Sequence, residues 1–134
     1  MSERDKSEIK IFASICIFYA LFMGFLAFIG LSFSAWRLTL LSPFEIFALF
    51  ESPPVLISSL GLLFYASWAR KLLITVSALA LGPLIIEMVM LITRIREVPS
   101  DPFYGSLATA IILLLHLGSI YYLRQGGVKA QFQP

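Results

Sequence analysis

The chain has very little of the chemistry on which enzymes and soluble domains depend. Among its 134 residues there is no asparagine, one cysteine, one histidine and only 13% charged residues. A soluble domain has about a quarter of its residues charged. One histidine and one cysteine exclude a metal site built from several such ligands, a disulfide within the chain and a bis-histidine haem site. The net charge of +2 is too small to indicate nucleic-acid binding.

Recognisable catalytic motifs are absent as well. The sequence contains no HExxH, CxxC or GxSxG motif and no glycine-rich phosphate loop. The serines within apolar segments are expected to donate back to carbonyls of their own helix. We therefore predict a non-enzymatic protein without a cofactor. The lack of thermolabile asparagine is typical of thermophilic proteins, which suggests a hot source.

What the chain does contain is long apolar segments. It is 59% hydrophobic, with a mean hydropathy of +0.90. About 20 apolar residues are needed to cross the hydrocarbon core as a helix. Four segments approach this length and predict an all-α, integral membrane four-helix bundle in a single transmembrane domain, with helices at about 9–34, 53–69, 72–93 and 103–123. The first segment is too long for a signal peptide, so we expect it to remain as a helix.

Small residues are spaced along one face of the first segment. Ala13, Ala20, Gly24 and Ala27 recur at intervals of three, four and seven residues. In lipid, such faces allow helix backbones to approach one another closely. Cys16 lies in the same segment and is expected to be a small buried side chain.

The segment SPFEIFALFESPPVL, residues 42–56, has two interpretations. Ser42, Pro43 and Glu45 form a capping box, which predicts a helix start. Pro53 and Pro54 disfavour an uninterrupted helix through the preceding residues. We favour a short interfacial helix over 43–50 at the outer surface, with Glu51 accessible to water. The alternative is one helix kinked at the prolines, which would place Glu51 inside the membrane.

Basic residues predict the orientation of the spans. A tight turn at residues 67–72 would bring the middle of the chain to the same side as both termini, and this side has most of the Lys and Arg. Because basic loops stay in the cytoplasm, we expect a cell-membrane protein with both termini cytoplasmic. The basic residues expected to contact anionic lipid head groups are Arg70, Lys71, Arg124 and Lys129.

Glu87 is a carboxylate within the apolar stretch LIIEMVMLITR, residues 84–94. Since an exposed charge in lipid is costly, Glu87 is expected to face the bundle and to have a partner. Arg94 lies on the same helical face two turns later, so the two can form an ion pair, directly or through water. One hypothesis is a structural contact, which we favour. The other is a proton-carrying carboxylate beside a helix bend at Pro83.

His116 is a third candidate for a polar contact inside the membrane. It shares a helical face with Gly105, Ala108, Ile112 and Ser119, which indicates that it points into the bundle. Along the membrane normal it is expected about 11 Å from Glu87, from the rise per residue of an α-helix. A direct pair between Glu87 and His116 is therefore not expected.

Two segments carry a resemblance to other proteins. The sequences GLLFYASWARKLL, residues 61–73, and YYLRQGGVKAQF, residues 121–132, resemble the inner hairpin and tail of small uncharacterised four-helix membrane proteins of bacteria and archaea. The resemblance covers the second half of the chain. It implies a fold with four spans and no particular activity. In the tail, the Gly126–Gly127 pair is expected to stop the last helix.

Two functions follow as hypotheses. The first is a small non-catalytic membrane protein that acts as an accessory or structural subunit of a larger membrane complex, with lipids and other membrane subunits as partners. The second is a homo-oligomeric proton- or ion-coupled transporter or channel that uses Glu87, and with it Glu51 if that residue lies at depth.

Overall fold

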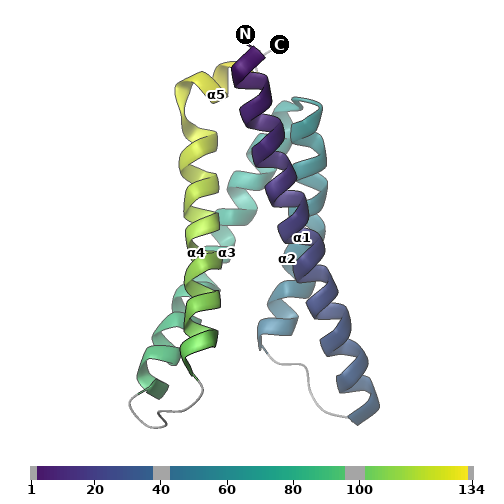
Figure 1. Ribbon diagram of the computed structural model, residues 1–134, viewed down its shortest axis with the longest axis vertical. Coiled ribbons are helices and arrows are strands. Elements are labelled where there is room, and N and C mark those ends of the chain that lie inside the picture. Colours follow the sequence, from purple (N-terminus) through teal and green to yellow (C-terminus); the bar gives the residue numbers. More distant parts are fainter. Residues whose placement is uncertain (1–2, 38–42, 96–101, 133–134) are drawn as a thin grey trace.

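A computed structural model describes the backbone of residues 3–37, 43–95 and 102–132, and the side chains of 6–32, 46–90, 92–93 and 107–132. These residues are helical almost throughout (Figure 1). The helices are α1 (Glu3–Arg37), α2 (Pro43–Leu63), α3 (Ser67–Ile95), α4 (Pro102–Arg124) and the short α5 (Gly126–Ala130). The prediction of an all-α chain is confirmed.

Four helices are long and apolar enough to cross a membrane, and the distribution of side chains agrees with a lipid surround. The candidate spans are Lys6–Ser32, Ile46–Leu63, Ser67–Met90 and Leu107–Arg124. Large apolar side chains such as Phe18, Phe64 and Leu79 are exposed on the outside, whereas Ser58 and Ser59 are completely buried. This is the reverse of a soluble protein, and it is what a multi-pass membrane protein requires.

The four long helices are arranged as two packed pairs joined by a third contact. Helix α1 packs on α2, α3 packs on α4, and α2 packs on α3. Both termini and the turn between α2 and α3 lie at one end of the molecule, and from that turn α2 and α3 diverge toward the other end (Figure 1). Near the end that has the termini, α1 also meets α4, where the rings of Phe12 and Tyr122 lie 4.7 Å apart.

The small residues Ala13, Ala20 and Ala27 of α1 are buried, as expected of a packing face, and α2 is the helix that packs most on α1. The buried positions of α1 alternate at spacings of four and three residues from Ile9 to Gly30. This seven-residue repeat is typical of helices that pack at a shallow crossing angle. At Gly24, an added Cβ would lie 3.4 Å from Ser52 Oγ, so the two backbones approach closely at this point.

Helix α2 differs from the favoured interpretation. Residues 43–50 do not form a separate interfacial helix, because Pro43–Leu63 is one continuous α-helix with Pro53 and Pro54 inside it. Glu51 is only 5% exposed, so it is buried and not accessible to water as expected. A proline removes one backbone donor, but a broken helix would leave more unpaired groups where lipid cannot bond them. A rule drawn from soluble helices therefore overestimates the effect of the prolines.

The turn between α2 and α3 comes earlier than predicted. Helix α2 ends at Leu63 instead of Ala69, and α3 already begins at Ser67. The amide of Tyr65 donates to the Leu62 carbonyl and that of Ala66 to the Gly61 carbonyl, while Tyr65 has a positive φ of 54°. These bonds form a Schellman motif, in which Tyr65 occupies the left-handed position that is usually glycine.

The tail also differs from the sequence prediction. Helix α4 ends at Arg124, close to the expected stop, but after Gln125 the Gly126–Gly127 pair opens a further short helix, α5. Val128 and Phe132 of this segment are buried in the apolar cluster nearest the termini. The tail thus packs back onto the bundle.

Two apolar clusters fill the interior of the bundle, one nearer the end with the termini and one farther from it. The first includes Ala13, Leu73 and Leu123, and the second includes Met23, Ala48 and Leu84. Tyr19 packs against both. Its ring therefore marks the junction between the two apolar layers, and polar side chains gather at this junction.

Candidate functional site

Three ionisable side chains from three helices meet at the junction of the two apolar clusters. Glu51 Oε1 of α2 lies 2.6 Å from His116 Nε2 of α4. The Tyr19 hydroxyl of α1 is 3.1 and 3.2 Å from the two Glu51 carboxylate oxygens, to which it donates, and 3.5 Å from His116 Nε2. We call Tyr19, Glu51 and His116 the polar cluster.

Each member of the polar cluster lies within a candidate membrane span and on the side of its helix that faces the other helices. Tyr19 and His116 are near the middle of the candidate spans Lys6–Ser32 and Leu107–Arg124, so each lies deep within its span. Glu51 follows Ala48 on the buried face of α2, one turn before Val55. The rings of Tyr19 and His116 meet edge to face, with centroids 5.8 Å apart, which fixes how the phenol and imidazole approach the carboxylate.

Burial determines the charge that the polar cluster can carry. Glu51 is 5% and His116 3% exposed. A net charge at such a place costs several kcal/mol, about 2.5–3.5 at a helix centre on insertion scales. One proton shared between carboxylate and imidazole makes the pair neutral overall. Either Nε2 donates to Oε1 or the carboxyl group donates to Nε2, and the short distance suits both.

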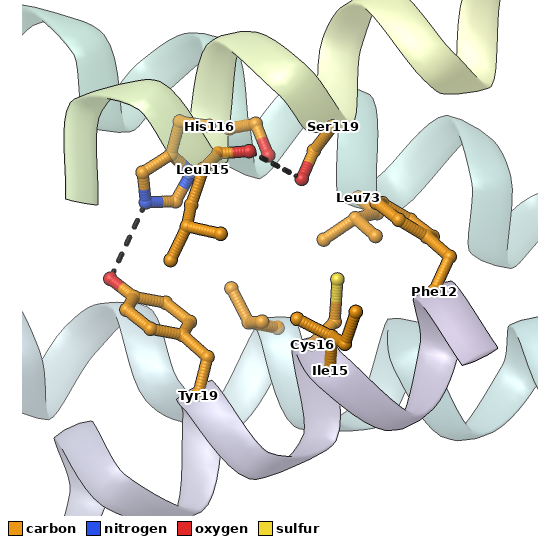
Figure 2. A pocket seen from close by; sticks show the side chains of 10 residues that line it. Phe12, Ile15, Cys16, Tyr19, Leu73, Leu115, His116 and Ser119 are labelled. Atoms are coloured by element: carbon orange, nitrogen blue, oxygen red, sulfur yellow. Dashed lines mark hydrogen bonds between the residues drawn. The ribbon is translucent and has the colours of Figure 1, made fainter. Parts of the chain in front are cut away.

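A small cavity of about 30 Å³ adjoins the polar cluster on its α1 and α4 side. Figure 2 shows Tyr19 and His116 facing each other at one end of it, with Cys16 pointing into the space between the helices. Ser77 of α3 also lines it, and its buried hydroxyl has no hydrogen-bond partner among the described residues. The hydroxyl of Ser119, in contrast, donates to the Leu115 carbonyl at 2.7 Å.

On its other side the polar cluster adjoins a larger groove between α2 and α3. This groove encloses about 300 Å³, and Glu51 is its one ionisable lining residue. Phe50 and Leu79 at its rim are 75% and 72% exposed, so the groove opens on the outer surface of the bundle. The remaining lining residues are apolar: Ile46, Phe47, Pro54, Val76, Ala80 and Pro83.

The three residues predicted to make polar contacts inside the membrane, His116, Glu87 and Arg94, have different surroundings in the structure. His116 is buried and makes a polar contact, as expected, but with Glu51. Glu87 is half-buried on α3, and it makes no hydrogen bond or ion pair with any side chain that the structure describes. The side chain of Arg94 lies outside the described residues, so the proposed pair between Glu87 and Arg94 stays a prediction.

Among the basic residues expected to contact lipid head groups, Arg70 differs because it makes a hydrogen bond within the protein. Its guanidinium Nη1 donates to the Leu123 carbonyl at 3.0 Å, which ties the start of α3 to the end of α4. Arg70 is half-buried, whereas Lys71, Arg124 and Lys129 are exposed at the same end of the bundle. A contact with lipid head groups stays a prediction for these residues.

Of the three members of the polar cluster, the sequence analysis missed Tyr19 and included Glu51 only in its less favoured interpretation. Tyr19 could not be recognised as a site residue, because an aromatic residue in an apolar helix is common and does not by itself indicate a function. Glu51 was identified only in the alternative interpretation of residues 42–56, as a carboxylate that one kinked helix would place at depth. No three His, Cys, Asp or Glu side chains come together as a metal site in the part of the chain that the structure describes.

Comparison with known proteins assigns no family to the chain. No family model matches it, and neither a curated protein nor a solved structure shows significant similarity. The polar cluster and its surroundings are therefore the features that bear on function. The resemblance to small four-helix membrane proteins stays a prediction.

Proposed function

We propose that the protein is a proton-coupled membrane transporter that works as a homo-oligomer, with the polar cluster as its proton-binding site. The observation that supports this most is the 2.6 Å contact between Glu51 and His116 in the middle of the bundle. Ionisable groups within membrane spans are expensive, and they commonly mark proton and substrate sites. A carboxylate and an imidazole in contact can exchange a proton with little movement.

The proposal moves the working carboxylate from Glu87 to Glu51. Glu51 is buried beside a second ionisable group and adjoins a groove, whereas Glu87 is half-buried without a described partner. Discontinuous or proline-containing helices often surround the sites of transporters, because their backbone can adjust. Helix α2 has Pro53 and Pro54 within one turn of Glu51, and each of them removes a backbone hydrogen-bond donor next to the acid.

Two matched carboxylate variants test this function. The purified protein is reconstituted in vesicles that contain a pH-sensitive dye, and solutes are screened for those that dissipate an imposed pH gradient. We expect Glu51→Gln and His116→Gln to abolish solute-dependent proton flux, and Glu87→Gln to retain it. Loss of flux in Glu87→Gln with retention in Glu51→Gln would return the site to α3 and overturn the assignment.

A second candidate function is that of an accessory subunit in a larger membrane complex. Glu87 favours it, because a half-buried carboxylate between the exposed Ile86 and Val89 needs a partner in lipid. A neighbouring chain can supply that partner. The test is extraction in mild detergent, with identification of any stoichiometric subunits that co-purify. Under this function Glu87→Gln is mild and Glu87→Leu weakens assembly, by about 0.6–1.7 kcal/mol for a membrane polar contact.

Both candidate functions share one placement in the membrane. The end that has both termini includes the start of α1, the start of α3, the end of α4 and α5. These segments contain Lys6, Lys10, Lys71, Arg124 and Lys129, and we assign this end to the cytoplasm. The cell membrane is the proposed location, and the protein is proposed to be non-enzymatic.

A further inference from the structure

The groove between α2 and α3 has the composition of a small-molecule site. Its volume of about 300 Å³ is at the lower end of the range for ligand pockets, which are mostly apolar with a few polar groups that set specificity. Here the one ionisable lining residue is Glu51. The candidate spans Ile46–Leu63 and Ser67–Met90 include every residue of the groove, so a ligand would enter it from the lipid.

Charge and aromatic content determine which ligand suits this groove. A carboxylate at the end of an apolar groove attracts a positive charge, and low surrounding polarity strengthens that attraction. Phe47 and Phe50 line the same groove and present rings that favour a cation further. An anion would be repelled by Glu51, and a strongly hydrated metal ion would find one carboxylate and no other oxygen ligand from a side chain. A lipophilic organic cation fits both the charge and the apolar walls.

We propose that the groove binds a lipophilic organic cation, whose positive charge pairs with Glu51 while its apolar groups lie against Phe47, Phe50, Val76 and Leu79. The inference rests on the proposed function and names the class of substrate that the transporter would exchange for a proton. Glu51 thus belongs to two sites at once, because it lines the groove and also contacts His116.

This shared carboxylate couples the cation to the proton. Without a cation, the buried pair is neutral when it holds one proton. With a cation in the groove, that proton would leave the site with a net positive charge, so we expect it to be released. The ionisable groups that face the pair are Tyr19 and Cys16 of α1. The α3 residues that line the adjoining cavity and groove are Leu73, Val76, Ser77, Leu79, Ala80 and Pro83, none of which is ionisable. One proton is therefore released for each cation bound.

The experiment measures binding of tetraphenylphosphonium to the purified full-length protein in detergent, with a pH indicator in weakly buffered solution. Tetraphenylphosphonium is a lipophilic cation without a hydrogen-bond donor. We expect saturable binding with release of one proton, and affinity that falls about tenfold per pH unit on acidification while the exchange is one for one. Triphenylphosphine oxide, a neutral molecule with similar rings, should not bind measurably.

Three variants separate the groove from the rest of the bundle. Glu51→Gln should lose proton release and at least about tenfold in affinity, as expected when one charge partner is removed. Leu79→Trp places a larger side chain in the groove, and the fold should tolerate it because Leu79 is exposed. It should weaken cation binding but leave proton binding by the Glu51–His116 pair intact. Glu87→Gln should match the unaltered protein in both measurements.

The possible outcomes distinguish this inference from the proposed function. Binding that is equal for the cation and its neutral analogue, or that is unchanged in both Glu51→Gln and Leu79→Trp, overturns the cation site. If the protein dissipates a pH gradient in a manner that requires Glu51 but binds no tetraphenylphosphonium, the inference fails and the proposed function stands. If Glu51→Gln changes neither proton flux nor proton release, both fail.

Discussion

Glu51 Oε1 and His116 Nε2 lie 2.6 Å apart, in contact between two helices, α2 and α4, that are neither consecutive in the chain nor packed as a pair. Tyr19 of α1 completes the contact through both carboxylate oxygens. One buried acid therefore links three of the four long helices.

The energetic coupling of this pair is open to a double-mutant cycle. We expect Glu51→Gln, His116→Gln and the double variant to show a coupling energy of about 0.5–3 kcal/mol, as residues in direct contact do. The free energy of unfolding is measured by denaturant titration in mixed micelles. The cycle of Glu87→Gln with His116→Gln is the control and should be additive within about 0.5 kcal/mol. Additivity of the Glu51 cycle would mean that the contact contributes nothing to stability.

Gly61 is predicted to be required at the turn between α2 and α3. An alanine Cβ there would lie 2.6 Å from the Ala69 Cβ and 2.9 Å from the Trp68 ring, so one of the two helices has to move. We expect Gly61→Ala to destabilise the protein by about 1–3 kcal/mol, as overpacking does. The matched control is Gly118→Ala, since nothing lies within 4 Å of its Cβ position in α4. Equal thermal stability of the two variants in detergent would contradict the close approach.

The contact between Arg70 and Leu123 predicts a structural role for one basic residue of the termini end. Arg70→Met removes a charged donor from the Leu123 carbonyl, a loss that is worth about 1.5–3 kcal/mol in general. Because the buried Arg70 Nε has no partner among the described residues, we expect the lower end of that range. Hydrogen exchange should increase around the end of α4 and in α5. Lys71→Met, at an exposed position, should leave both stability and exchange unchanged.

Orientation in the membrane is tested by cysteine labelling of intact cells. Cys16 is the only cysteine and is buried, so Cys16→Ala provides a background without thiols. In that background Ser100→Cys, in a segment outside the described residues, should react with an impermeant maleimide from outside. Tags at both termini should report cytoplasm. Labelling of Ser100→Cys only after lysis, with termini that are accessible from outside, would invert the topology.

The sequence by itself determined the class of the protein and the number of its spans. Composition and segment length suffice for this, because the cost of exposing backbone or charge to lipid depends on local sequence and hardly on tertiary contacts. The same holds for the face of α1 that includes Ala13, Ala20 and Ala27, whose spacing alone shows that helices approach there. His116 was likewise identified as pointing inward from its helical position.

Only the tertiary structure decided the site. Whether Pro53 and Pro54 break α2 depends on the balance between one lost donor each and the larger cost of a broken helix in lipid, and this balance brought Glu51 to the interior. The partner of His116 could not be read from the sequence, since the depth of Glu51 depends on that continuous helix and on the packing of α1 against α2. Tyr19 became a functional candidate because its hydroxyl lies beside an acid that is distant in sequence.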